Sequence, residues 1–131
     1  LQHHDRLFIR KLGVSVDTLK RGDIIVFHAP DDNGKDYIKR VVAFPNEYVQ
    51  IENGMVYING KRLEEPYINT QYTHITDEKE WYVGENELFV LGDNRIEGMS
   101  KDSRYFGPIK GDSIVGKAFF RFFPLTNMKS F

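Results

Sequence analysis

Cysteine is absent from this chain of 131 residues, and no long apolar run is present either. The first absence excludes disulfide frameworks, cysteine metal sites and thiol catalysis. The second excludes a membrane-spanning helix within these residues, because such a helix needs about 20 consecutive apolar residues. Neither charge is in large excess, since 18 Lys and Arg oppose 19 Asp and Glu. We therefore expect no nucleic-acid partner, because nucleic-acid binders usually carry a basic excess.

What is present fits a folded globular chain. Apolar residues make up 40% and charged residues 28%, which are ordinary values for a domain with a hydrophobic core. The length predicts a single domain over residues 1–131, because domains most often hold roughly 100–150 residues. The histidines are not arranged with metal-ligand spacing, so we expect no metal site. We expect no cofactor.

Alternation of apolar and polar residues predicts a mainly β fold. Four short runs rich in β-branched and aromatic residues are expected to be strands; they cover residues 23–27, 37–42, 87–91 and 117–123. Turn residues at 30–34 predict a hairpin between the first two. We expect a small antiparallel barrel or folded β-sheets with little helix.

Two Asn-Gly pairs give the clearest local signal. Asn53 and Gly54, then Asn59 and Gly60, interrupt the alternation over residues 47–63. Asn-Gly suits a type I′ turn, whose two central residues need positive φ, so we predict a three-stranded antiparallel meander.

The remaining segments are less regular. Residues 69–85 are polar and indicate a surface excursion, and residues 92–109 indicate an ordered loop. The best helical candidate, residues 110–115, is only about one turn long, since a turn takes roughly 3.6 residues.

Lys39 lies in an apolar strand, next to Ile38, Val41 and Val42. Burial of an unpaired ammonium is costly, so such a lysine points to solvent, is paired, or is held neutral. A neutral lysine is a general base, because burial lowers its pKa. The residues alone leave a solvated lysine and a catalytic one open.

Polar side chains follow the apolar strand at 87–91. They comprise Asp93, Asn94 and Arg95, then Ser100, Asp102, Ser103 and Arg104. An active site at a strand end has this composition, and so does a loop held by its own Asp–Arg pairs. Both interpretations stay open, whereas the spacing does not fit a calcium loop.

Five segments together resemble bacterial type I signal peptidases. Residues 21–27 (RGDIIVF), 36–42 (DYIKRVV) and 92–104 (GDNRIEGMSKDSR) resemble three conserved boxes of that family, in the same order. Residues 57–61 and 65–67 are typical of its Gram-positive members. The resemblance covers nearly the whole chain.

The resemblance implies a membrane-associated serine endopeptidase with a Ser–Lys dyad. It would act at the extracytoplasmic face of the cell membrane and remove signal peptides from exported preproteins after small residues. Its partners would be those signal peptides and the membrane surface. Lys39 matches the general base, and Ser100 matches the serine that orients it. Asp102 and Arg104 match a buried pair that braces the site, and the surrounding residues are Asp93, Asn94 and Arg95.

Three departures from the family pattern accompany this resemblance. The nucleophilic serine and a membrane anchor are expected to precede Leu1, so we expect residues 1–131 alone to be inactive. Residues 43–47 read AFPNE where the family has Gly-x-Pro-Gly-Asp, and this puts the local backbone in question. Two extra residues lie between Arg95 and Ser100.

These departures keep a second interpretation open. A signal-peptidase-like accessory protein, which assists pilus assembly with pilin partners and without proteolysis, also fits a divergent member. A self-cleaving repressor domain fits less well, since no DNA-binding segment is present.

A separate hypothesis concerns a membrane-facing aromatic patch near the end of the chain, formed by Phe119, Phe120, Phe122 and Phe123. Packing of all four in small cores is the alternative.

Overall fold

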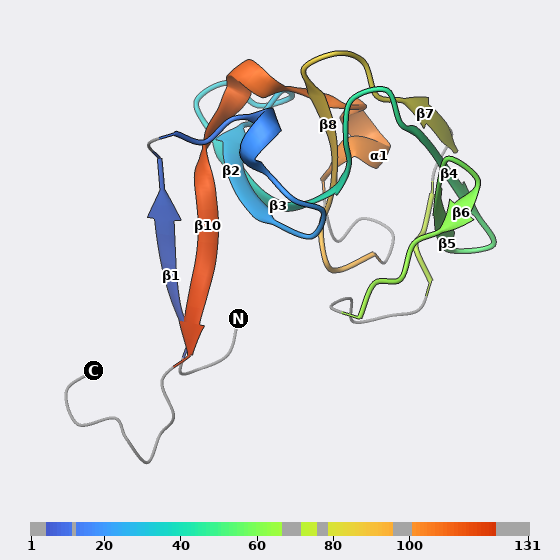
Figure 1. The fold of residues 1–131 in the computed structure, drawn as a ribbon, viewed down its shortest axis with the longest axis horizontal. Helices are drawn as coiled ribbons and strands as arrows, with labels where there is room; N and C mark the ends of the chain where they lie inside the picture. The colour runs from blue at the N-terminus through green and yellow to red at the C-terminus, as the bar shows by residue number, and fades with distance from the viewer. Residues whose placement is uncertain (1–4, 12, 67–71, 76–78, 96–100, 123–131) are drawn as a thin grey trace.

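A computed structural model describes residues 5–11, 13–66, 72–75, 79–95 and 101–122. Its strands form two antiparallel sheets, which confirms the expected mainly β fold. The larger sheet contains, in spatial order, β1 (Asp5–Arg10), β10 (Ile114–Phe122), β2 (Ile24–His28), β3 (Asp36–Ala43), β8 (Glu87–Leu91) and β9 (Ile109–Lys110). The smaller contains β6 (Lys61–Arg62), β5 (Met55–Ile58), β4 (Tyr48–Glu52) and β7 (Glu80–Tyr82). In Figure 1 the β1–β10 pair and the smaller sheet lie at opposite ends of the molecule.

The smaller sheet forms where the Asn-Gly pairs predict it. Asn53 and Gly54 connect β4 to β5, and Asn59 and Gly60 connect β5 to β6. All four residues have positive φ, between 51° and 82°, as type I′ turns require. The predicted meander is therefore confirmed, and the hairpin of β2 and β3 is confirmed as well.

Strand β8 separates two apolar cores. Its alternate residues Leu88 and Val90 pack into one core with Phe27 of β2, whereas Phe89 and Leu91 pack into the other with residues of the smaller sheet. A strand buried on both faces needs a continuous apolar sequence, which explains the unbroken apolar run at 88–91. The polar loop that follows β8 therefore begins between the two cores.

Two irregular segments differ from expectation. The prediction of a surface excursion over residues 69–85 is wrong for the end of that segment. There β7 pairs with β4, and Trp81 and Val83 are buried. Trp81 lies against Phe89 with ring centroids 4.9 Å apart. A strand of three residues is too short for alternation to reveal it. The expected loop at 92–109 contains the helix α1 (Ser103–Phe106) and the short strand β9.

Single 3-10 turns account for the other helical residues that the structure describes, η1 (Val16–Thr18) and η2 (Gly111–Ser113). The second lies within the predicted helical candidate, residues 110–115. Within the described ranges, no helix has the length and apolar composition needed to cross a membrane.

Candidate active site

Lys39 lies in the middle of β3, on the strand face that also carries Tyr37 and Val41. Val41 is fully buried in the core that contains Phe27, and Tyr37 packs against that core. Ile38, on the opposite face, is 45% exposed. Of the apolar neighbours that suggested burial, Val41 shares the lysine's face, whereas Ile38 and Val42 do not.

The ammonium of Lys39 is half-buried. Desolvation lowers the pKa of Lys39 below its ordinary value of 10.5, and it outweighs the opposing attraction of Asp102. Arg104 lowers this pKa further, and Asp93 raises it. The direction and the cause both agree with the interpretation in which burial lowers the pKa of this lysine, one of the two that the sequence leaves open. Among the residues that the structure describes, none forms a hydrogen bond or ion pair with Lys39 Nζ.

Three aromatic rings support this side of β3. Lys39 Nζ lies 5.6 Å from the ring centroid of Tyr37. Tyr37 stacks on Phe106 of α1 at 6.1 Å and meets Phe27 edge-on at 6.2 Å. These rings limit the access of water to one side of the lysine, which agrees with desolvation as the main cause of its lowered pKa.

Asp102 and Arg104 form a buried ion pair at the start of α1. The Arg104 guanidinium donates to both carboxylate oxygens of Asp102, at 2.9 and 2.7 Å. Asp102 also accepts from the backbone N–H of Arg104, which makes it the N-cap of α1, and from the backbone N–H of Gly92. The carboxylate therefore joins the helix start to the end of β8.

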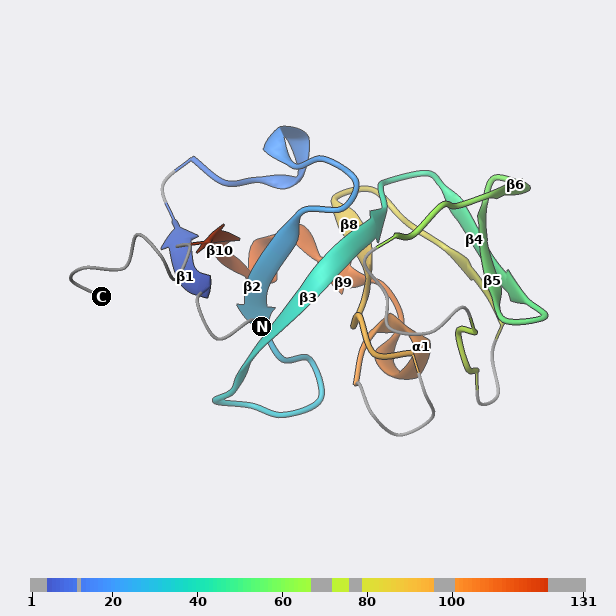
Figure 2. The ribbon, with the colours of Figure 1, turned by 90° about the horizontal axis from the view of Figure 1, so that it is seen from below.

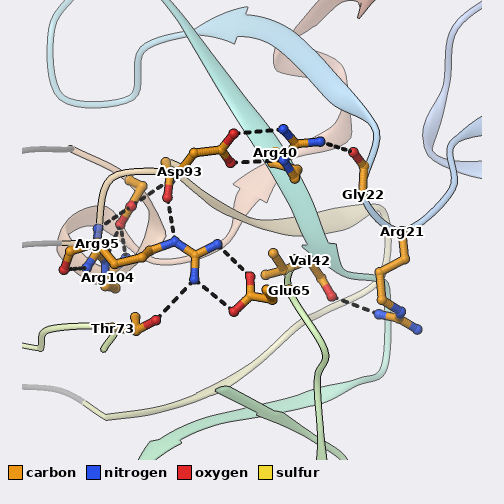
Figure 3. Close-up of polar contacts among 11 residues, drawn as sticks. Arg21, Gly22, Arg40, Val42, Glu65, Thr73, Asp93, Arg95 and Arg104 are labelled. Carbon is orange, nitrogen blue, oxygen red and sulfur yellow. Dashed lines mark hydrogen bonds and ion pairs between the residues drawn. The ribbon is translucent and has the colours of Figure 1, made fainter. Parts of the chain in front are cut away.

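Arg95 is fully buried and extends this network (Figure 3). Its guanidinium donates to both carboxylate oxygens of Glu65 and to the Thr73 hydroxyl, and its Nε donates to the Gly92 carbonyl. The Arg95 carbonyl accepts from Arg104 Nη1 at 3.0 Å. The side chains of both buried arginines thus donate to carbonyls of the loop after β8, Arg95 to Gly92 and Arg104 to Arg95.

Sequence reasoning missed Glu65 as the partner of Arg95. Thirty positions separate them, so no local pattern connects the two residues. A signal was available: Glu65 belongs to the segment 65–67 that resembles Gram-positive signal peptidases, and a buried arginine requires a carboxylate partner. Thr73 stands in the segment expected to be a surface excursion, yet it is buried.

Arg40 and Asp93 hold the other side of the loop. Arg40 Nε and Nη2 donate to the two carboxylate oxygens of Asp93 at 2.9 and 2.7 Å, and Nη1 donates to the Gly22 carbonyl. Asn94 lies between Asp93 and Arg95 and is partly exposed. The structure therefore gathers five of the seven candidate site residues, Lys39, Asp93, Arg95, Asp102 and Arg104, around the middle of β3 and the end of β8, with Asn94 in the same loop.

Ser100 and the two-residue insertion before it lie outside the described residues. The proximity of Ser100 to Lys39 thus stays a prediction. Of the four phenylalanines near the end of the chain, Phe119 is exposed. The side chains of Phe120, Phe122 and Phe123 lie outside the described part of the structure. The aromatic patch stays a hypothesis for the same reason.

The segment 43–47 shows how the chain accommodates its departure from Gly-x-Pro-Gly-Asp. Asn46 has a φ of 69°, a left-handed conformation that Asn tolerates better than most other residues with a side chain. Glu47 accepts a hydrogen bond from the Phe44 backbone N–H and pairs with Arg21 at 2.8 Å. Ala43 ends β3 in an ordinary strand conformation. The backbone turn therefore forms without glycine.

The arrangement offers a lysine whose burial favours the neutral form, beside a loop fixed by buried ion pairs. A neutral amine accepts a proton, so the geometry suits general-base chemistry. Among the described residues, no group of three or more His, Asp or Glu side chains is positioned to hold a metal ion.

Comparison with known proteins identifies the family. Residues 1–123 match the family model described as signal peptidase, peptidase S26. Signal peptidase IB of Staphylococcus aureus is 37% identical over 98% of this chain and 74% of its own length. Signal peptidase I of Bacillus caldolyticus is 37% identical over 95% of this chain and 72% of its own length.

A solved structure agrees with these relatives. The crystal structure of a signal peptidase I from Enterococcus faecalis superposes with a TM-score of 0.64 at 37% identity, and the match covers 76% of this chain and 96% of that one. The family indicated by the sequence resemblance is thereby confirmed. The chain belongs to the signal peptidase family, peptidase S26.

Proposed function

We propose that this protein removes signal peptides from exported preproteins, with Lys39 as the general base of a Ser–Lys dyad. Residues 1–131 would form its peptidase domain, at the membrane surface on the extracytoplasmic side. The observation that carries the proposal is the half-buried Lys39, whose pKa desolvation lowers. The Nζ of Lys39 also lies over the Tyr37 ring, which packs against the core that contains Phe27.

The chemistry follows from a neutral amine at this position. Lys39 Nζ takes the proton of a serine hydroxyl as the serine oxygen attacks the scissile carbonyl carbon. The resulting ammonium then gives that proton to the departing amine, which leaves an acyl-enzyme. Water next attacks the ester and loses a proton to Lys39. Lys39 returns this proton to the serine oxygen as the ester bond breaks, and the signal peptide is released with a free carboxyl group.

The serines whose side chains the structure describes do not fit the role of nucleophile. Ser103 is buried, and its Oγ accepts from the Val90 backbone N–H at 2.9 Å. Ser113 donates to the Lys110 carbonyl at η2, and Ser15 precedes η1. We therefore propose a nucleophile outside these three, with Ser100 as the orienting group, and we expect residues 1–131 alone not to cleave.

The buried pairs would act as support. Asp102, Arg104 and Arg95 fix the loop after β8, and Arg40 with Asp93 fixes its other side. Each guanidinium is held by two parallel hydrogen bonds to its carboxylate, an arrangement that sets orientation as well as distance. A rigid loop would hold Ser100 at a constant distance from Lys39, as a dyad requires.

The test compares Lys39→Met with Lys35→Met in the full-length protein. Mass spectrometry follows cleavage of a peptide that contains an Ala-x-Ala site. Loss of a general base lowers kcat by about 10²–10⁴-fold, so Lys39→Met should be nearly inactive. Lys35 lies between β2 and β3 and is exposed, and among the described residues its side chain forms a salt bridge with Asp32 alone. Lys35→Met should therefore retain activity.

Equal activity of Lys39→Met and the parent would refute the proposed base. An inactive full-length parent with an intact fold would instead favour the pilus-assembly accessory protein, for which pilins are the partners. The turn at Asn46 weakens that alternative, because it shows that one departure from the family pattern leaves the backbone turn intact.

A further inference from the structure

Phe106 is the last residue of α1 and packs against the aromatic ring that lies beside Lys39. The rings of Phe106 and Tyr37 stack with 6.1 Å between their centroids and 23° between their planes. Phe27 meets both rings edge-on, at 6.2 Å from Tyr37 and 6.4 Å from Phe106. Residues of β2, β3 and α1 thus form one aromatic cluster, and Lys39 Nζ lies 5.6 Å from the Tyr37 centroid.

The Tyr37 ring is held by three contacts. Phe106 stacks on it, and Phe27 meets it edge-on. The Tyr37 hydroxyl donates a hydrogen bond to the Asp31 carboxylate, which raises the pKa of Tyr37. Phe27 and Asp31 belong to β2 and to the loop that connects it to β3, so they are part of the same hairpin as Tyr37. Of the three contacts, that of Phe106 comes from outside the hairpin.

The position of Phe106 depends on the same residue that fixes the loop after β8. Asp102 is the N-cap of α1, and its carboxylate accepts from the Gly92 backbone N–H. The backbone N–H of Phe106 donates to the Asp102 carbonyl at 3.2 Å, about one helical turn along the chain. Helix α1 lies beside β8 in both views of the fold (Figure 1, Figure 2). The buried ion-pair network therefore also places the Phe106 ring.

The surroundings of the Lys39 amine are apolar on one side and charged on the other. Desolvation is the largest cause of the lowered pKa of Lys39, and the apolar contacts come from the Tyr37 ring and from Ile25, its fully buried cross-strand partner on β2. Charged groups act on Lys39 and Tyr37 from the start of α1, from the loop after β8 and from the loop between β2 and β3; they are Asp102, Arg104, Asp93, Asp31 and Asp32.

Loss of the Phe106 ring would leave these charges in place and change the access of water. The Tyr37 ring would lose the side chain that stacks on it, and water could enter between the ring and the amine. The ring also attracts an ammonium, but 5.6 Å is close to the limit of about 6 Å for this attraction. Desolvation therefore decides the direction, and hydration of the amine would raise the pKa of Lys39.

We propose that Phe106 is a positioning residue for Lys39, which acts by holding the Tyr37 ring beside the amine and so keeps water from one side of Nζ. Phe106 itself would contact neither the substrate nor the transferred proton. The inference rests on the role of Lys39 as the general base proposed above, but the effect of Phe106 on Lys39 is measurable without peptidase activity.

NMR titration of the Lys39 Cε methylene in the 131-residue chain tests the proposal. Phe106→Ala should move the titration midpoint to higher pH, because water reaches the amine. Phe106→Leu keeps much of the apolar volume and should move it less, and this variant decides the test if Phe106→Ala does not fold. The matched control is Phe89→Leu, which removes a ring from the other core, where Phe89 packs on Trp81.

The control should lower stability and leave the Lys39 midpoint unchanged. An unchanged midpoint in the Phe106 variants, or an equal movement in Phe89→Leu, would overturn the proposal. A double-mutant comparison tests the route through Tyr37. In a Tyr37→Leu background Phe106→Ala should move the midpoint little further, and an undiminished movement there would show that Phe106 does not act through Tyr37.

The pH profile of the full-length protein gives a second readout. Phe106→Ala should lower kcat/KM for the Ala-x-Ala peptide by about threefold or more near neutral pH, since each pH unit below the pKa reduces the neutral fraction of a base about tenfold. At alkaline pH the variant should regain the parent value. A loss that is equal at every pH would show structural damage and overturn the positioning role. A moved midpoint in a parent without activity would keep that role and refute the proposed peptidase function.

Discussion

The loop after β8 and the turns of the smaller sheet are held in opposite ways. The loop is fixed by buried charges, since Arg95, Asp102 and Arg104 are at most 6% exposed. The turns are fixed by backbone conformation, through Asn-Gly pairs with positive φ. Arg95 finds its carboxylate partner, Glu65, 30 positions away in the sequence, whereas the positive φ of each turn is adopted by its own two residues. The comparison teaches that the loop proposed to carry function depends on tertiary contacts, whereas the conformation of the Asn-Gly turns is set locally.

The largest expected effect comes from breaking a buried ion pair. Asp102→Ala should lower the free energy of unfolding by about 3–5 kcal/mol, because Arg104 is left as a buried, unpaired charge. Urea denaturation measures this loss. Lys110→Ala, which removes the exposed pair with Glu87, should cost less than about 0.5 kcal/mol.

If Asp102→Ala does not fold, Asp102→Asn keeps the size of the side chain and allows the measurement. Equal losses for the Asp102 variants and Lys110→Ala would break the comparison, since burial would then add nothing to the ion pair.

A smaller loss is expected from a neutral group in the same region. Ser103→Ala removes the acceptor of the buried Val90 N–H, and an unsatisfied buried donor costs about 1–3 kcal/mol. Ser113→Ala is the matched control, because the Ser113 hydroxyl donates an exposed hydrogen bond to the Lys110 carbonyl. Thermal unfolding should separate the two variants, and a similar Tm for both would show that the region tolerates loss of a buried acceptor.

The turns of the smaller sheet are sensitive to conformation instead. Asn59→Ala places a residue with a Cβ and no compensating side-chain bond at a φ of 51°, which costs about 1–2 kcal/mol. It also removes the acceptor of the Tyr48 N–H. Asn59→Gly loses the same bond but accepts positive φ freely.

The glycine variant should therefore be the more stable of the two in urea denaturation. An alanine variant as stable as the glycine variant would show that positive φ does not limit this turn.

The smallest effect concerns the dependence of stability on pH. The pKa of Lys39 is lowered in the folded state, so below that pKa the fold carries the cost of half-burying an ammonium. As pH rises from that lowered pKa toward 10.5, the folded state loses the proton first and the cost is relieved. The parent should therefore gain stability relative to Lys39→Met over this interval.

Paired urea titrations at increasing pH measure this difference. A difference that stays constant with pH would contradict the lowered pKa of Lys39.

Sequence alone placed several features correctly. The strands around Lys39, the hairpin of β2 and β3, and both Asn-Gly turns were predicted, because each depends on residues close together in the chain. The family was indicated by short segments for the same reason. Trp81 and α1 were missed, since their burial depends on contacts with β4 and with the end of β8.

Local chemistry thus determined where this chain turns, where it extends and which lysine merits attention. Only the tertiary structure decided that Glu65 pairs with Arg95, that Asp102 joins Gly92 to α1, and that Lys39 is half-buried. The physical reason is that an alternating pattern is set by the chain itself, whereas a lowered pKa and a buried ion pair depend on which distant segments exclude water from a charge.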